Sequence, residues 1–154
     1  MTTLTPLPAT TTAPANSIPT LAKISSRAAA ALMVGVSLFE LALLAGVPWG
    51  HAAFGGAEAV LSPPLRVAAA ISVLVWAAAA LVVLRRAGHR TWAPLPSKAL
   101  PVAVWVLAGY TALGILVNAI SPSPIERAIW VPLTAVISAL LFTVAIASRR
   151  KVAK

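Results

Sequence analysis

The chain has 154 residues, of which 60% are apolar and 10% are charged, and its formal net charge is +9. Soluble domains carry about 25% charged residues. This chain therefore has too few polar side chains to cover a soluble globule, and we expect a membrane protein. It contains no cysteine, which excludes disulfides and cysteine-based metal or iron–sulfur sites.

The first 22 residues are rich in Thr, Pro and Ala and contain no charged side chain. Four prolines interrupt this segment, and no helical period is visible in it. We therefore predict a disordered tail over residues 1–22. Lys23 and Arg27 follow, and the apolar run after them is too long for the core of a signal peptide.

Four apolar runs follow the tail, and each is long enough to cross a bilayer. A helix rises about 1.5 Å per residue, and the hydrocarbon core is about 30 Å thick. Because backbone groups inside a bilayer must bond one another, each run is predicted to be a helix. The sequence thus predicts an all-α, four-helix transmembrane bundle within residues 23–154. Its helices are expected at residues 28–46, 67–84, 99–120 and 128–147.

Lysine and arginine are unequally divided between the two ends of this predicted bundle. Ten of them precede the first helix, join the second and third helices, or follow the fourth, and only Arg66 and Arg127 lie at the other end. By the positive-inside rule, the N-terminus, the middle loop and the C-terminus are predicted to be cytoplasmic. The net charge is therefore a topology signal that also attracts anionic lipid, and we expect no nucleic-acid partner.

Glu40 is the only charged residue within the four predicted helices. It lies about 10 Å below the outer end of the first helix, where an ionised carboxylate is costly. Glu40 should therefore face the bundle and either find a partner or stay protonated. Ser72, Thr111 and Thr134 lie at a similar depth on the other helices. These four residues form a candidate ion or proton site, or Glu40 simply ties helices together through a hydrogen bond.

The third and fourth helices carry small and polar residues three or four positions apart, so that they share a face. These are Thr111, Gly114 and Asn118 on the third helix, and Glu126, Trp130, Thr134 and Ser138 on the fourth. We expect these faces to pack together, with a polar substrate path as the alternative. Trp130 is expected in the interfacial aromatic belt and Trp76 in helix packing. The segment Ser123-Pro124-Ile125-Glu126 predicts a capping box.

The first outer loop is long for a hairpin and is expected to fold back as a small lid at the headgroup layer. Its glycines suit tight turns, and Trp49 and Phe54 suit the interface. A lone His51 is a weak metal ligand, so no metal site is predicted. Arg66 and Arg127 are expected to pair with Glu58 or Glu126 at the surface. A candidate outward pocket for an anionic or zwitterionic group comprises His51, Arg66, Asn118, Ser121, Glu126 and Arg127.

Two segments resemble a group of small four-helix bacterial membrane proteins that have no established activity. They are Pro48-Trp49-Gly50 with Gly55-Gly56, and Asn118-x-x-Ser121-x-Ser123-x-x-Glu126-x-x-x-Trp130-x-Pro132. The resemblance covers the four helices and implies the bacterial plasma (inner) membrane. The single carboxylate of the first helix also resembles that of small multidrug transporters, which are four-helix dimers. The long Thr/Pro tail and the longer loops depart from that second group.

Two functions remain after the catalytic motifs are examined. The sequence has no phosphate-binding glycine loop, no nucleophile elbow and no zinc-protease motif, so we expect neither an enzyme nor a cofactor. The favoured function is structural or accessory, through contacts with the lipid bilayer or with a partner membrane protein. The alternative is a small proton- or cation-coupled transporter that works as a homo-oligomer and uses Glu40.

Overall fold

The computed structural model describes residues 20–149, and most of the predicted tail lies outside them. Four long helices make up most of this part: α1 (Thr20–Leu44), α2 (Pro63–Arg86), α3 (Leu100–Ala119) and α4 (Pro124–Ala147). No strand occurs between residues 20 and 149. All four helices are long and apolar enough to cross a membrane, as the sequence predicts.

Three of the helices are longer than the apolar runs that predicted them. α1 begins at Thr20, inside the segment assigned to the tail, because its first turns are buried: Ala22 and Ser26 have no exposed surface. α2 and α4 each begin four residues early, at a proline that follows a serine. Proline suits the first turn of a helix, since its missing N–H has no partner to lose there.

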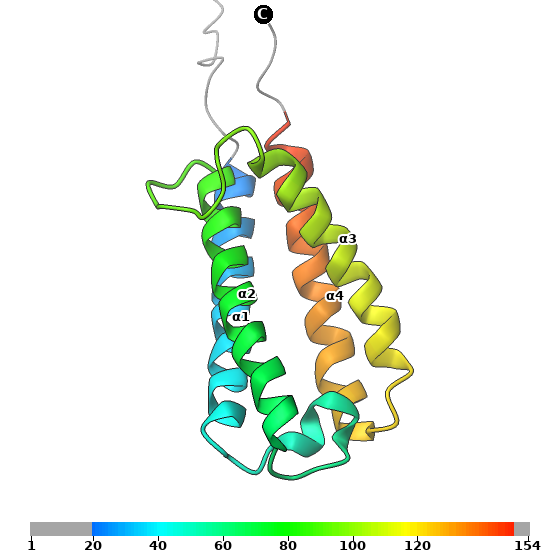
Figure 1. Ribbon diagram of the computed structural model, residues 1–154. Coiled ribbons are helices and arrows are strands. Elements are labelled where there is room, and N and C mark those ends of the chain that lie inside the picture. Colours follow the sequence, from blue (N-terminus) through cyan, green and yellow to red (C-terminus); the bar gives the residue numbers. More distant parts are fainter. Residues whose placement is uncertain (1–19, 150–154) are drawn as a thin grey trace, which may run out of the picture.

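The helices pack as two antiparallel hairpins, α1 with α2 and α3 with α4 (Figure 1). The hairpins join mainly where α1 contacts α4, and α2 contacts α3 much less. Large buried side chains fill one half of the bundle; they are Met33, Val83, Val104, Ile137 and Leu141. A smaller cluster of Leu43, Ala53, Leu61 and Ala69 lies near the other end, beside the α1–α2 loop.

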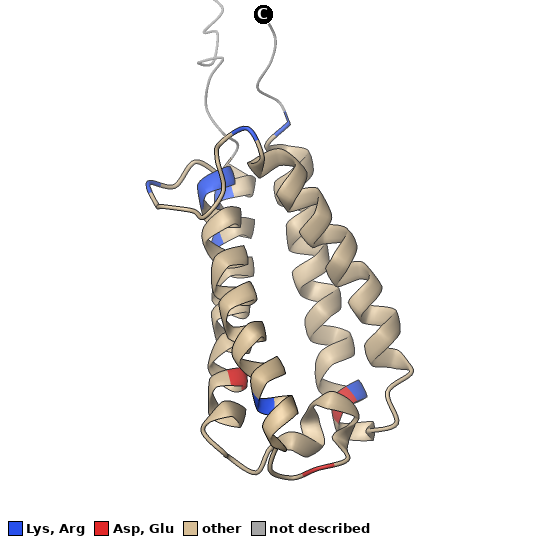
Figure 2. Cartoon of the chain, in the orientation of Figure 1, with Lys and Arg blue, Asp and Glu red and all other residues tan. Residues whose placement is uncertain are grey.

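Basic residues gather at one end of the described bundle (Figure 2). This basic end holds the start of α1, the α2–α3 loop and the end of α4, with Lys23, Arg27, Arg85, Arg86, Arg90, Lys98 and Arg149. The other end, called the loop end below, holds the α1–α2 loop and all three glutamates of the chain. The structure thus separates the charges along the bundle axis as the sequence predicts.

The α1–α2 loop folds into two short 3₁₀ helices, η1 (Gly50–Ala52) and η2 (Phe54–Gly56). It lies across the loop end and contacts α4, which is distant in sequence (Figure 1). This packing agrees with the predicted lid.

Half of the predicted capping box forms at the start of α4. The Ser123 hydroxyl accepts a hydrogen bond from the backbone N–H of Glu126 at 3.2 Å. The Glu126 carboxylate does not return to Ser123, because it accepts instead from the N–H of Gly55 at 3.0 Å. The carboxylate expected to close the capping box therefore holds the loop.

Candidate functional site

A cavity of about 420 Å³ lies in the half of the bundle nearer the loop end. All four helices and the α1–α2 loop contribute to its wall. Its polar lining comprises Glu40, Ser72, Thr111, Asn118, Glu126 and Thr134. Its aromatic lining comprises Phe54, Trp76, Tyr110 and Trp130. The cavity is thus an amphipathic chamber within the span, with polar groups on several sides.

The four residues of the candidate ion or proton site line this one cavity, each from a different helix. Glu40 comes from α1, Ser72 from α2, Thr111 from α3 and Thr134 from α4. The four helices thus turn these side chains toward one space.

Glu40 has an unusual environment for a carboxyl group. Its Oε2 atom is buried and has no hydrogen-bond partner among the described residues. A polar oxygen buried without a partner is costly, and more so at membrane depth. The hydrogen bond expected of a purely structural Glu40 is therefore missing at this atom, which leaves it ready to accept from a ligand or to carry a proton.

The two threonine hydroxyls of the cavity wall present acceptors rather than donors to the cavity. Thr111 Oγ1 lies 3.0 Å from the carbonyl of Leu107, and Thr134 Oγ1 donates to the carbonyl of Trp130 at 2.5 Å. A hydroxyl has one donor and two acceptor positions. Because the donor is used within the helix, each oxygen can only accept from a ligand. Together with Glu40, these oxygens favour a cation or a hydrogen-bond donor.

Three hydrogen bonds hold the α1–α2 loop against α4 and across the cavity. Ser123 Oγ donates to the carbonyl of His51 at 2.6 Å, and Trp130 Nε1 donates to the carbonyl of Ala52 at 2.5 Å. The third bond is the one that Glu126 accepts from Gly55. The Ser121 hydroxyl donates to the same Glu126 oxygen. Side chains at the start of α4 thus bond three backbone groups of the loop, at residues 51, 52 and 55.

The backbone of the loop has a shape that its sequence must permit. Gly55 and Gly56 have φ of 82° and 75°, in the left-handed region that favours glycine. Phe54 also has a positive φ, 51°, which is uncommon for a residue with a large side chain. This conformation places Phe54 on the cavity wall. The loop therefore accepts backbone strain while it contributes an aromatic ring to the site.

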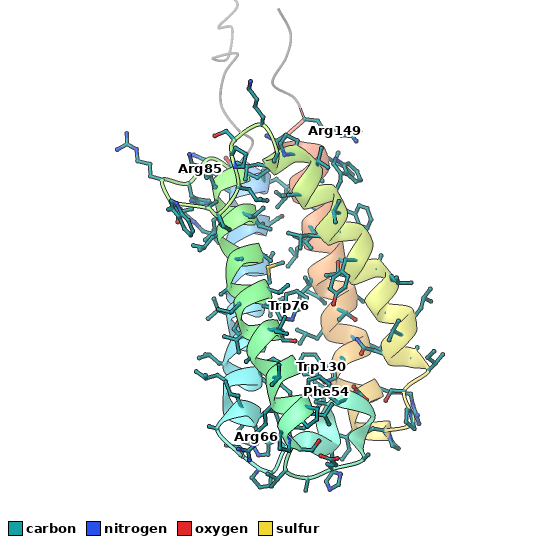
Figure 3. The ribbon with its side chains drawn as sticks, in the orientation of Figure 1. Phe54, Arg66, Trp76, Arg85, Trp130 and Arg149 are labelled. Atoms are coloured by element: carbon teal, nitrogen blue, oxygen red, sulfur yellow. The ribbon has the colours of Figure 1, made fainter. Side chains whose placement is uncertain are left out.

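Aromatic rings line the cavity at two levels. Trp130 packs edge-to-face against Phe39, with ring centroids 5.1 Å apart. Trp76 of α2 and Tyr110 of α3 lie 6.3 Å apart and tilted, across the gap between the hairpins. In Figure 3, Phe54 and Trp130 lie toward the loop end, and Trp76 lies nearer the middle of the bundle. Aromatic faces attract cations, which agrees with the acceptor-rich lining.

The structure does not assemble the six residues of the predicted outward pocket. Asn118 and Glu126 line the cavity, and the other four do not. Arg66 Nε donates to the backbone carbonyl of the residue five positions earlier, at 3.0 Å, and Arg127 donates to the carbonyl of Ser121. His51 Nδ1 lies 2.8 Å from a carbonyl of its own loop. No lysine or arginine of the described chain lines the cavity, so it lacks the charge that an anion needs.

The expected surface ion pairs are replaced by bonds to the backbone. Glu58 Oε2 accepts from the N–H of Ser62 at 2.7 Å, at the start of α2. Glu126 bonds Gly55 and Ser121, as described above, while the two arginines donate to carbonyls. These backbone groups lie at the ends of helices and in turns, where they have no hydrogen-bond partner within a helix. Each charged side chain therefore satisfies a nearby backbone group instead of an opposite charge.

The predicted packing between α3 and α4 is confirmed. Ser138 Oγ lies 3.4 Å from the carbonyl of Ala108, and the methyl group of Thr134 lies 3.9 Å from the position of a Cβ at Gly114. The same face also reaches the cavity, so packing and a polar site are not alternatives here. Trp130 and Trp76, assigned to the interface and to packing, line the cavity as well.

Comparison of the chain with protein-family models, with curated proteins and with solved structures finds no match.

Proposed function

We propose that this chain is a multi-pass membrane protein that binds small organic cations in the cavity and exchanges them for a proton on Glu40. The observation that carries the proposal is the buried, unpartnered Oε2 of Glu40 in a chamber whose wall includes the acceptor oxygens of Thr111 and Thr134 and four aromatic rings. An incoming cation would replace the proton, so that the buried carboxylate is neutral or paired in both states. In this proposal the chain performs no bond chemistry and needs no cofactor.

Exchange of a proton for a cation within the span is the central step of a small proton- or cation-coupled transporter. The half of the bundle nearer the basic end is filled by large side chains, so one chain offers no continuous path between its ends. We therefore propose that transport involves a homo-oligomer, in which a second copy completes the path. A structural or accessory role, through lipid or a partner membrane protein, is the competing function and requires no cation binding.

The direct test is binding of hexyltrimethylammonium to the purified chain in mild detergent, followed by tryptophan fluorescence. Trp76 and Trp130 line the cavity, so their emission reports occupancy. We expect saturable binding that weakens as the pH falls, because protons compete for Glu40. Absence of saturable binding at every pH from about 5 to about 9, a range that covers buried carboxyl groups, would contradict the cation site and leave the accessory role.

We further propose that the basic end is cytoplasmic and the loop end extracellular, in a bacterial plasma membrane. The natural chain has no cysteine, so single cysteines report topology without background labelling. Ala57→Cys and Pro122→Cys at the loop end should react with a membrane-impermeant maleimide in intact cells, and Arg90→Cys should react only after lysis. All three positions are exposed in the structure. The reverse labelling pattern would overturn this orientation.

A further inference from the structure

We infer that the ligand of this cavity is an amphiphilic cation that enters from the lipid, between α2 and α3, and not from water at the loop end. The inference rests on the proposed cation site and adds the class of ligand and its route. Three features of the cavity carry it: a loop end covered by a bonded loop, an open side and the depth of that side.

The α1–α2 loop covers the cavity at the loop end and is bonded in place, although Phe54 within it is 37% exposed. Its backbone is bonded to α4 at His51, Ala52 and Gly55, and Ala53 between them is 7% exposed. Ala53 and Phe54 form the part of the cavity wall that this loop contributes. A ligand that arrived from water would have to break several of these bonds first.

The side of the cavity opens where α2 and α3 face each other. These are adjacent helices that contact each other little. Tyr110, Leu113 and Val117 of α3 line the cavity, yet they are 60%, 58% and 57% exposed. Three such side chains, all more than half exposed and three or four residues apart on α3, mark the edge of an opening. We call this opening the α2–α3 portal.

The portal lies within the apolar layer of the membrane. Ser72 and Trp76, its α2 side, are nine and thirteen residues from the first residue of α2. At about 1.5 Å per residue, they lie roughly 14–20 Å along the helix from its start. A strongly hydrated ion does not partition to that depth, whereas a cation with an alkyl or aromatic body does. Trp76 and Tyr110 flank the opening and offer rings that attract a cation in transit.

The experiment measures the association rates of alkyltrimethylammonium ions from butyl to octyl. The protein is held in lipid nanodiscs, and its tryptophan emission is recorded by stopped flow. The head group and charge are constant in this series, and only partitioning into lipid changes. If the ligand arrives through lipid, the association rate constant, referred to the concentration in water, should rise about fourfold per methylene. If it arrives through water, that rate constant should stay flat and only the dissociation rate should fall.

Two single-cysteine variants of α3 test the position of the portal. Leu113→Cys lies on the portal, and Leu116→Cys, three residues on and 65% exposed, does not line the cavity. After reaction with N-phenylmaleimide, the adduct at 113 should slow association by about tenfold or more, the change produced by about 1.4 kcal/mol of added barrier. The adduct at 116 should leave the rate unchanged.

The outcomes separate this inference from the proposed function. If binding is saturable but the association rate constant does not depend on alkyl chain length, lipid access is overturned and the cation site is retained. Unchanged rates with both adducts also overturn the portal. Absence of saturable binding by any member of the series overturns the cation site and the inference together.

Discussion

Glu40→Gln is expected to abolish the release of protons that accompanies cation binding. A quaternary ammonium ion carries no titratable proton, so every proton released on its addition comes from the protein. Glutamine keeps the size and hydrogen-bonding capacity of Glu40 but cannot ionise. The bound cation would then lie in a low-dielectric chamber without its counter-charge, and loss of one partner of a buried ion pair costs about 3–5 kcal/mol. We therefore expect affinity to fall by about 100-fold or more.

The measurement uses a pH-indicator dye in weakly buffered detergent, with hexyltrimethylammonium added to the wild type and to each variant. Glu58→Gln is the matched control, since Glu58 lies in the loop, does not line the cavity and bonds a backbone N–H. It should release protons as the wild type does. Equal release from Glu40→Gln would contradict the role of Glu40.

Glu40→Ala separates a binding role from a structural one. A structural Glu40 that bonds a neighbouring helix would lose about 1–2 kcal/mol of stability on truncation, while Gln would be silent in every assay. With Oε2 unpartnered in the structure, we expect Ala to unfold at nearly the same temperature as the wild type while cation binding is lost. A clear fall in thermal stability with unchanged binding would return Glu40 to the structural role.

Depth along the helices was the part of the site that the sequence could predict. Antiparallel spans of similar length bring residues of similar predicted depth near one another, and Glu40, Ser72, Thr111 and Thr134 do line one cavity. Polar side chains also turn away from lipid, which fixes the face of each helix. Axial position and burial cost were therefore sufficient to find this polar layer before any contact was known.

The lid contacts could not be predicted in the same way. Gly55 and Glu126 are 71 residues apart and meet through a backbone N–H, which carries no sequence signature. Proximity to Arg127 in sequence favoured a surface ion pair for Glu126. In the structure, these charged side chains instead bond backbone groups. The free-energy cost of an unpaired backbone N–H or carbonyl in a poorly hydrated region exceeds the stabilisation that a solvated surface ion pair provides.

Helix ends were underestimated for a related reason. The apolar runs covered only the most hydrophobic part of each helix, whereas α1 continues past Arg27 and Lys23 to Thr20. Its first turns are buried at Ala22 and Ser26, and Ser26 Oγ lies 3.1 Å from Nε2 of His89 in the α2–α3 loop. Tertiary packing sustains these turns where hydropathy falls.

Gly56→Ala is expected to detach the α1–α2 loop and open the cavity to water. A Cβ at Gly56 would lie 2.6 Å from Cβ of Ser123 and 2.9 Å from the carbonyl oxygen of His51, far inside van der Waals contact. The residue also has φ of 75°, which an alanine adopts only with strain. Both costs fall on the contact that holds the loop to α4. Together they should raise the free energy of the closed loop by about 1–3 kcal/mol.

The opening is measured at Asn118→Cys, a cysteine on the cavity wall, with a membrane-impermeant maleimide. In the Gly56→Ala background, its labelling rate should rise about tenfold or more, since about 1.4 kcal/mol is a tenfold change in the open population. Gly109→Ala is the matched control, because a Cβ there meets nothing within 4 Å and Gly109 does not line the cavity. It should leave the labelling rate unchanged. If Gly56→Ala also left that rate unchanged, the loop would not be the barrier between the cavity and water.

Because cations are inferred to enter through lipid, Gly56→Ala should leave the chain-length dependence of their association intact while it exposes Asn118→Cys. Water access and ligand access are then separable in a single protein.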